Sequence, residues 1–214
     1  MEKIVDFQIK NMNKKGGTME IILASNNKNK LKEITNILKP FDIKVISQES
    51  TGFDIDVEET GTTFAENAVL KAEAIYHLSK KPVISDDSGL EIDYLHGEPG
   101  IYSKRYAGAN ATNQDRINKI LNLMENAKEE ERTARFVCAV CYIDEKGEKH
   151  IFQETCEGTI LKEPRGENGF GYDPIFLYKD RTFAQMNGQE KDKVSHRGKA
   201  LRRMAEYFKG ENKN

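Results

Sequence analysis

Long apolar runs and a surplus of charge of either sign are both missing from this 214-residue sequence. The longest apolar stretches are only a few residues, such as 21–24, whereas a helix that spans a bilayer needs about 20. Nothing in the sequence therefore predicts a membrane protein. The 33 basic and 35 acidic residues leave a formal net charge of -2. Without a basic surplus we expect no binding to nucleic acid.

A secretory signal is also missing, because the charged first 15 residues have neither an apolar central region nor a small-residue cleavage site. We therefore expect a cytoplasmic protein. The sequence has only three cysteines, Cys138, Cys141 and Cys156, and an odd number without secretory context argues against a disulfide framework. Cys138 and Cys141 could form a metal or redox pair, but three positions apart on a predicted strand they point to opposite faces. We expect ordinary buried thiols.

The length favours one folding unit, large enough to bury a core and to form two lobes. We expect residues 1–18 to be a flexible extension and residues 19–210 to form a single domain. Strands are expected at 20–24, 43–46 and 82–85, with an antiparallel hairpin at 134–143 and 150–158. Helices are expected after the first strand, after a cap at Thr62 or Thr63, at 113–126, and after a cap at Ser195. This order predicts an α/β fold with a mixed central sheet flanked by helices.

The first of four polar segments runs from Ser25 to Lys30, between the first strand and the first helix. Free backbone N–H groups and the helix dipole at such a junction favour a phosphate, and Lys30 would add a point charge. The segment has no glycine, so it is neither a P-loop nor a dinucleotide-binding fingerprint. The alternative is a solvated polar loop.

The second segment is acidic, and its members come from two places in the sequence: Asp54, Asp56, Glu58, Glu59, Asp86 and Asp87. Asp86 and Asp87 follow the third predicted strand, and ligands bind at the carboxyl ends of strands in open α/β sheets. Mg²⁺ usually takes one or two protein carboxylates, with water and substrate phosphates completing its shell. The pattern suits Mg²⁺, although Asp86 and Asp87 could instead simply cap a turn.

The remaining two segments could meet a nucleotide. Asn67 and Lys71 share the face of the second helix that is turned away from its apolar stripe, where a lysine is usually solvated. In Gly169–Pro174, glycines on either side of Phe170 free the backbone to bring that ring against a flat ligand, and the segment 191–198 adds cationic donors. These features suggest a base pocket. They could also be a core aromatic residue and a charged first helical turn.

Six motifs occur in one order along the chain: Ser25-x-Asn27-x-x-Lys30, Phe64-x-Glu66-Asn67-Ala68-x-x-Lys71-Ala72, Ser85-Asp-Asp-Ser-Gly-Leu90, Pro99-Gly-Ile-Tyr-Ser103 with Arg105-Tyr106, Gly169-Phe-Gly-Tyr-Asp-Pro174 and Ser195-His-Arg-Gly198. Together they resemble the signatures of the inosine triphosphate pyrophosphatases. The resemblance covers about residues 19–208. It implies an elongated α/β fold with a deep substrate cleft between two lobes, usually built as a homodimer.

The resemblance also implies an activity, namely Mg²⁺-dependent hydrolysis of non-standard purine nucleoside triphosphates (ITP, dITP and XTP) to the monophosphate and pyrophosphate. Glu59 and Asp87 would hold Mg²⁺. Asp87 would also act on the attacking water, with Lys71 and Ser88 at the same reaction centre. The triphosphate would bind to Ser25, Asn26, Asn27, Lys28, Asn29 and Lys30. The base and sugar would bind to Phe170, Gly171, Tyr172, Asp173, Lys191, His196 and Arg197.

Two other functions remain open at this point. A related house-cleaning pyrophosphatase acting on pyrimidine or modified nucleotides would not require the segment from Ser195 to Arg197. A regulator could bind purine triphosphates without hydrolysing them. The pair Asp86-Asp87 and Lys71 weigh against the regulator, because binding alone needs fewer carboxylates near a polyanion.

Overall fold

The computed structural model describes residues 18–53 and 55–211. Almost all of the predicted extension, and Asp54 of the acidic segment, lie outside the described residues. The division into an extension and a single domain at 19–210 therefore stays a prediction.

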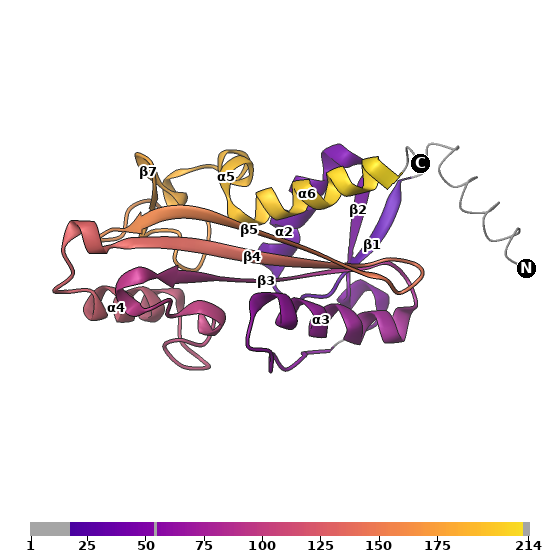
Figure 1. The fold of residues 1–214 in the computed structure, drawn as a ribbon, viewed down its shortest axis with the longest axis horizontal. Helices are drawn as coiled ribbons and strands as arrows, with labels where there is room; N and C mark the ends of the chain where they lie inside the picture. The colour runs from indigo at the N-terminus through magenta and orange to yellow at the C-terminus, as the bar shows by residue number, and fades with distance from the viewer. Residues whose placement is uncertain (1–17, 54, 212–214) are drawn as a thin grey trace, which may run out of the picture.

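Seven strands form one open, mixed sheet in the order β2-β1-β3-β4-β5-β6-β7 (Figure 1). β1 is parallel to β2 and β3, and the remaining pairs are antiparallel. The strands are β1 Met19–Leu23, β2 Ile43–Ser47, β3 Val83–Ile92, β4 Thr133–Ile143, β5 Lys149–Ile160, β6 Phe176–Tyr178 and β7 Arg181–Thr182. The predicted α/β class and the predicted hairpin are confirmed.

Among the described residues, the α-helices are α2 Lys28–Leu38, α3 Phe64–Ser79, α4 Asn113–Leu123, α5 Gly188–Val194 and α6 His196–Glu211. α2 and α6 pack on one face of the sheet, where Ile34 and Leu201 meet Ile84 of β3. α3 packs on the opposite face, where Ala72 meets Val83. As predicted, a threonine caps α3: Thr63 accepts from the Glu66 amide and Glu66 bonds back to Thr63.

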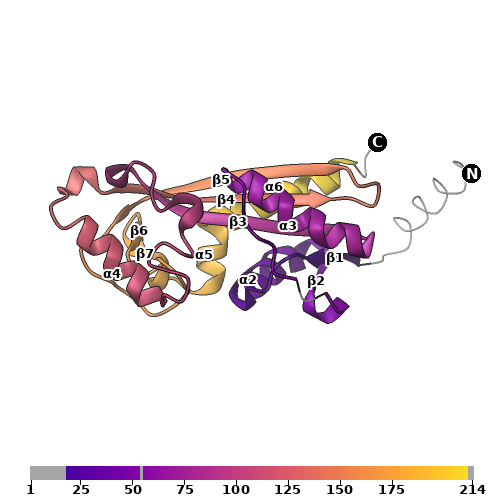
Figure 2. The same cartoon turned by 90° about the horizontal axis from the view of Figure 1, so that it is seen from below.

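The molecule is elongated, because β3, β4 and β5 run along most of its length (Figures 1 and 2). β1, β2, α2 and α3 lie toward one end, and α4, β6 and β7 lie toward the other, where a separate core cluster includes Phe136, Phe176 and Ile120. We call these the α3 end and the α4 end. The deep cleft implied by the resemblance stays a prediction.

The cysteine prediction is confirmed. Cys138 belongs to the core on the α2/α6 face and Cys141 to the core on the α3 face, so the two thiols point to opposite sides of β4. All three cysteines are free and buried. Burial raises the pKa of Cys138 to about 12, which keeps its thiol protonated and unreactive.

Three expectations about the elements were wrong. The third strand does not end before Asp86, because β3 pairs with β4 along ten residues and carries Asp86 and Asp87 in its middle. α4 ends at Leu123, three residues before the expected end. Asn67 is not on a solvated face but fully buried, because its amide bonds to β3 and to the turn before α3. The sequence reading also missed β6, β7 and α5.

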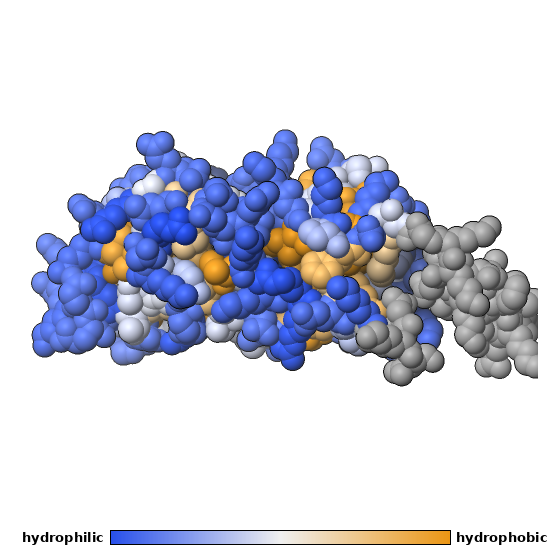
Figure 3. Space-filling model, turned by 90° about the horizontal axis from the view of Figure 1, so that it is seen from above, coloured by the Kyte–Doolittle hydropathy of each residue, from blue (hydrophilic) through white to orange (hydrophobic). Residues whose placement is uncertain are grey.

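In the part of the chain that the structure describes, no helix combines the length and apolarity needed to cross a bilayer. The face of the molecule in Figure 3 is mostly hydrophilic, with apolar side chains in scattered patches.

Candidate active site

Asp86 and Asp87 are neighbours in the middle of β3, at the point where β1 has ended. The last residue of β1, Leu23, pairs with Ile84, so β3 continues past its parallel neighbour. Adjacent residues on a strand point to opposite faces. Asp86 therefore points to the face covered by α2 and α6, and Asp87 to the face covered by α3. Each carboxylate is the centre of a different cluster of charges.

The cluster around Asp86 is almost fully buried, and we call it the buried network: Lys30, Glu33, Asp86, Asp173, Lys191 and Arg197. Arg197 lies 3.0 Å from Asp86 and also pairs with Glu33. Lys30 Nζ lies 3.0 Å from the same Asp86 oxygen. Because Glu33 and Lys30 are on α2 and Arg197 is on α6, Asp86 connects both helices to the sheet.

The second half of the buried network joins α2 to α5. Lys191 Nζ lies 2.9 Å from Glu33 Oε1 and 2.6 Å from Asp173 Oδ2. Asp173 is in the turn that precedes β6, so this chain of pairs connects the α3 end of the molecule to the segment that leads to the α4 end. Lys191 and Arg197 are 6% and 2% exposed, which places both cations out of bulk water.

The charges of the buried network stabilise one another. Burial disfavours the ionised form of Asp86, but Lys30 and Arg197 outweigh it and hold the pKa of that carboxyl well below its usual range. Burial likewise opposes the charge of Lys191, but Asp173 and Glu33 more than compensate and raise its pKa. These shifts keep Asp86 and Lys191 ionised at neutral pH, whereas burial raises the pKa of Asp173 in the same network. One oxygen of Asp86, Oδ1, has no hydrogen-bond partner among the described residues.

Phe170 lies beside the two cations of this network, 4.9 Å from Lys191 Nζ and 5.8 Å from the Arg197 guanidinium. Gly169 and Gly171 have φ of 74° and 65°, as expected for a backbone that only glycine adopts easily. A side chain at Gly169 would also place its Cβ 2.0 Å from Asp173 Oδ2. The turn therefore requires a glycine at position 169.

Two predicted base-pocket residues lie in apolar surroundings. His196 stacks on Phe136 with ring centroids 4.7 Å apart, and burial lowers its pKa well below the usual value, so the ring is neutral. Its Nδ1 has no hydrogen-bond partner among the described residues. Tyr172 is part of the core at the α4 end, and its hydroxyl donates to the Ser103 carbonyl at 2.9 Å. Tyr172 thereby anchors the loop that follows β3.

The cluster on the other face is more accessible, and we call it the open network: Glu59, Lys71, Asp87 and Arg105. Lys71 Nζ lies between two carboxylates, 2.8 Å from Glu59 Oε1 and 3.1 Å from Asp87 Oδ1. Arg105 lies 3.3 Å from the second oxygen of Glu59. Asn67 donates to Asp87 Oδ2 at 3.3 Å.

Burial raises the pKa of Asp87, and the nearby Lys71 ammonium only partly offsets it. A carboxyl with a raised pKa is a stronger base than an ordinary aspartate once it has lost its proton. Lys71 remains charged, because Asp87 and its acidic neighbours raise its pKa against the effect of burial.

The predicted phosphate loop is not as open as expected. Asn27 caps α2, and its Oδ1 accepts from the amides of Asn29 and Lys30, so two N–H groups that we expected to be free are bonded within the loop. Asn26 bonds to Gln48 and to the Ile55 carbonyl. Ser25, Asn27, Lys28 and Asn29 keep exposed or half-buried side chains at the end of β1, next to Asp86.

The open network has the chemistry of a Mg²⁺ site. Glu59 and Asp87 are hard oxygen donors, and Lys71 Nζ already places one positive charge between them. Among the described residues, a group of three close metal-ligating side chains occurs elsewhere, at Asp144, Glu148 and His150 beside the β4–β5 turn. A Mg²⁺ ion at Glu59 and Asp87 would therefore need substrate oxygens and water to complete its shell.

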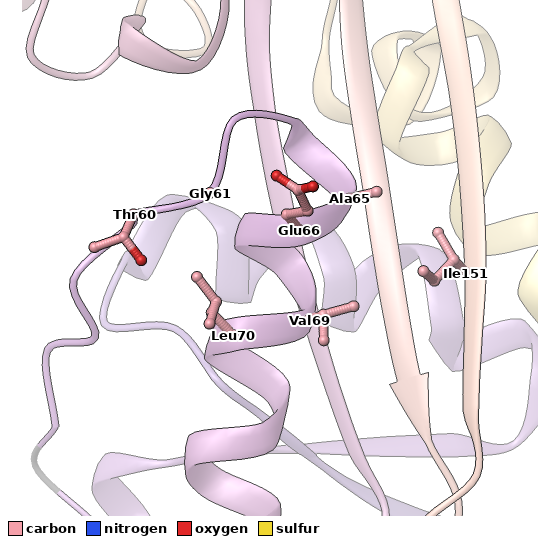
Figure 4. A pocket seen from close by; sticks show the side chains of 7 residues that line it. All are labelled: Thr60, Gly61, Ala65, Glu66, Val69, Leu70 and Ile151. Atoms are coloured by element: carbon pink, nitrogen blue, oxygen red, sulfur yellow. The ribbon is translucent and has the colours of Figure 1, made fainter.

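A pocket of about 370 Å³ is lined by residues of α3, of the segment that precedes it and of β5 (Figure 4). Val69 and Leu70 of α3 and Ile151 of β5 give it an apolar lining. None of the predicted substrate residues lines this pocket, which makes it a poor candidate for a triphosphate.

Sequence reasoning missed Glu33 and Arg105 as members of the site and gave Asp86 no role beyond the acidic pair. Glu33 could have been found, because it lies three positions after Lys30 and four before buried Ile37, on the face that α2 turns to the core. Arg105 belongs to one of the six motifs, but no local pattern indicates that its side chain reaches Glu59.

Comparisons with known proteins agree on one family. The sequence profile of the Ham1 family matches residues 21–207. The chain is 46% identical to the dITP/XTP pyrophosphatase of Clostridium perfringens, over 89% of this chain and 98% of that protein. It is 47% identical to the dITP/XTP pyrophosphatase of Bacillus subtilis, over 87% of this chain and 95% of that protein. The solved structure of the Ham1 protein of Staphylococcus aureus superposes with a TM-score of 0.79 at 45% identity, over 90% of this chain and 99% of that chain.

Proposed function

The chain belongs to the Ham1 family, and on that premise we propose that it hydrolyses non-standard purine nucleoside triphosphates such as ITP, dITP and XTP to the monophosphate and pyrophosphate. Relatives that share nearly half of its residues along most of their length are dITP/XTP pyrophosphatases. The observation that carries the proposal is the carboxylate–ammonium–carboxylate arrangement of Glu59, Lys71 and Asp87.

The open network is the proposed reaction centre. Glu59 and Asp87 hold Mg²⁺, which neutralises charge on the phosphate oxygens when it is bound. Asp87 orients the attacking water and accepts its proton, in keeping with its raised pKa. Lys71 contributes a positive charge at the phosphate that is attacked. Ser88 donates to Asp86 at 3.3 Å and accepts from Arg197 at 2.8 Å, so its side chain belongs to the buried network on the other face of β3.

The polar loop at the start of α2 holds the triphosphate. Lys30 reaches Asp86 from this loop, so its ammonium lies close to both networks. Ser25, Asn26, Asn27, Lys28 and Asn29 line the approach to it. A triphosphate carries about four negative charges, and lysines in this loop together with a bound metal ion compensate them.

The buried network and Phe170 select the base. Hypoxanthine and xanthine have a 6-oxo acceptor where adenine has a 6-amino donor. Lys191 and Arg197 are permanent donors, so an oxo group can be satisfied where an amino group would face another donor. A buried donor that loses its partner costs roughly 1–3 kcal/mol, which disfavours adenine. Phe170, between Gly169 and Gly171, offers a flat surface for the ring.

We further propose that the enzyme is a homodimer, on the strength of the family resemblance alone, and that it is cytoplasmic, as expected from the sequence. The sequence pattern supports neither a nucleic-acid partner nor a membrane partner.

Release of pyrophosphate from inosine triphosphate, measured with and without Mg²⁺, tests the function. We expect rapid release with the metal ion, little without it, and slow hydrolysis of adenosine triphosphate. Faster turnover of uridine or modified pyrimidine triphosphates would support the related house-cleaning activity instead. Tight binding of inosine triphosphate without any pyrophosphate release would indicate a regulator.

A further inference from the structure

Arg105 reaches the reaction centre from the α4 end of the molecule. It lies in the loop between the short 3-10 helix η4, Gly100–Tyr102, and α4. Its guanidinium lies over the Tyr102 ring at 4.8 Å and contacts Glu59 at 3.3 Å. The Arg105 side chain is 39% exposed, against 2% for Arg197 in the buried network. Arg105 is therefore an accessible cation at the open network.

The backbone around Arg105 is held from several sides. The carbonyl of Ser103 accepts from Tyr172, the carbonyl of Lys104 from Arg116 and the carbonyl of Tyr106 from Lys119. Ser103 itself is buried and bonds β3 through the amide of Leu90. A half-exposed side chain on such a fixed backbone is preorganised to meet a ligand.

The charges of the open network explain why Arg105 needs an anionic partner other than Glu59 when a metal ion binds. Glu59 serves two cations, Lys71 through one oxygen and Arg105 through the other. A metal ion held by Glu59 and Asp87 competes with both cations for the same oxygens. Lys71 and Arg105 then require new anionic partners, and the phosphates of the substrate are the anions that arrive with the metal ion.

The order of the residues indicates which phosphates Arg105 meets. Arg197 marks the base pocket, Asp87 the attacked phosphate, and Glu59 separates Asp87 and Lys71 from Arg105. A nucleotide that follows this order of contacts, with its attacked phosphate at Asp87, places its β- and γ-phosphates nearest to Arg105. The planar guanidinium fork suits phosphate oxygens better than a lysine does.

We propose that Arg105 is a binding residue for the β- and γ-phosphates, and hence for the leaving pyrophosphate, and that it exchanges Glu59 for phosphate when metal and substrate bind. The proposal rests on the proposed function and deepens it. It makes Arg105 a ligand of the product, whereas a purely structural role would make it a support for Glu59.

The two roles predict opposite effects on metal binding, and Arg105→Ala separates them. The variant should bind pyrophosphate in the presence of Mg²⁺ about tenfold or more weakly, because charge-assisted hydrogen bonds are lost. It should bind Mn²⁺ alone as tightly as the wild type or a few-fold more tightly, because a competing cation near Glu59 is gone. Its affinity for inosine monophosphate, which lacks the β- and γ-phosphates, should not change.

Isothermal titration calorimetry with pyrophosphate and inosine monophosphate, and Mn²⁺ titration followed by electron paramagnetic resonance, measure these affinities. Arg105→Lys should recover part of the pyrophosphate affinity. Arg135→Ala is the matched control, because Arg135 is 32% exposed and pairs with Glu91, Asp93 and Glu157 away from both networks; it should leave all three affinities unchanged.

Parallel weakening of Mn²⁺ and pyrophosphate binding in Arg105→Ala would overturn the proposal and assign Arg105 to the support of Glu59. Unchanged pyrophosphate affinity would overturn it as well. These readouts use binding alone, so they remain separate from the proposed function, which fails if wild-type protein binds pyrophosphate but releases none from inosine triphosphate.

Discussion

Asp86 and Asp87 are adjacent in the sequence, yet the charge clusters around them differ in almost every physical respect. The centre of the buried network is shielded from water, with Arg197 and Asp86 2% and 1% exposed, although Lys30 and Glu33 at its edge are 14% and 17% exposed. The open network has Glu59 at 20% and Arg105 at 39% exposed. Breaking a buried ion pair from one side typically costs about 3–5 kcal/mol, whereas a solvent-exposed pair contributes at most about 1 kcal/mol. The buried network is suited to hold a fixed pattern of donors, and the open network to exchange its partners for metal and substrate.

The largest effect that this comparison predicts is on turnover, at the open network. Asp87→Asn should lower kcat for inosine triphosphate by about 10²–10⁴-fold, because the base and a metal-binding charge are both lost. The fold should persist, since asparagine has the size of aspartate and its one carbonyl oxygen can still accept from Asn67 or from Lys71. Steady-state kinetics and thermal melting measure the two properties. Asp93→Asn, which alters an exposed partner of Arg135, is the control. Wild-type turnover in Asp87→Asn would reduce Asp87 to a structural residue.

The direction of the Asp87 pKa shift adds a pH test. The proposed base acts only when ionised, and burial raises its pKa, so turnover should fall as the pH is lowered through that pKa. Mg²⁺ on the same carboxylate would oppose this shift, so the test is the kcat/KM profile at Mg²⁺ well below saturation, which reports the metal-free enzyme. Its acid limb should lie at higher pH than an ordinary aspartate would give, and a profile that remains flat down to about pH 4, the ordinary aspartate value, would argue against Asp87 as the base.

At the buried network the main expected effect is on stability. Arg197→Ala leaves Asp86 and Glu33 as buried charges with fewer partners, and should lower the free energy of unfolding by about 3–5 kcal/mol. The ratio of kcat/KM for inosine to adenosine triphosphate should also shrink. Arg203 lies on the same helix, and its side chain is 60% exposed and pairs with Glu154. Arg203→Ala is the control and should lower the free energy of unfolding by less than about 1 kcal/mol.

Urea unfolding of Arg197→Ala and Arg203→Ala measures the loss of stability. Steady-state kinetics of Arg197→Ala with inosine and adenosine triphosphate measures the ratio of kcat/KM. Equal stability losses in the Arg197 and Arg203 variants would contradict the prediction that the buried ion pairs contribute more to stability than the exposed pair. An unchanged substrate ratio would place Arg197 on the phosphates or give it a purely structural role.

Glu33→Gln should have a smaller effect, because the amide keeps a hydrogen-bond acceptor for Lys191 or Arg197. We expect a stability loss of roughly 1–3 kcal/mol and a modest decrease in base selectivity, since both cations lose a charged partner. Glu20→Gln is the control, because Glu20 of β1 forms an exposed pair with Lys44 of β2. A Glu33 variant as stable and selective as wild type would show that α2 contributes no charge to the selection of the base.

The smallest expected effect comes from Asp192, next to Lys191. Burial, with a contribution from Glu33, raises the pKa of Asp192 from 3.8 to about 6. The unfolded chain therefore releases this proton at lower pH than the folded protein does, and folding stability decreases as pH rises from about 4 to about 6. Asp192→Asn should remove this decrease and melt slightly higher than wild type at pH 7. Identical pH dependence of melting in both proteins would contradict the assignment.

The parts of the fold that were predicted correctly depend on local patterns. The stripe of Phe64, Ala68, Ala72 and Ile75 defined α3, and all four side chains are buried. The hairpin of β4 and β5 follows from its apolar segments and the polar turn between them. β3 was predicted too short, because Asp86 and Asp87 look like a strand end. Their charges are tolerated inside the sheet only because cations from α2, α3 and α6 pair with them.

The candidate site was predictable as a set of residues but not as two clusters. The family resemblance brought Lys71, Asp87, Lys191 and Arg197 into one list, and the structure separates them into clusters on the two faces of β3. Glu33 was missed because a charged residue on a helix usually faces solvent. Arg105 was missed because its contact with Glu59 joins residues 46 positions apart.

By itself the sequence determined the α/β class, the caps and apolar faces of the helices, and, through its motifs, the family. These properties are local, because hydrophobic periodicity and capping depend on residues a few positions apart. Only the tertiary structure decided which charges pair. The alternation of side chains along β3 sends Asp86 and Asp87 to opposite faces. The packing of α2, α3 and α6 against those faces encloses Asp86 among buried cations, whereas buried Asp87 shares its cluster with the more exposed Glu59 and Arg105.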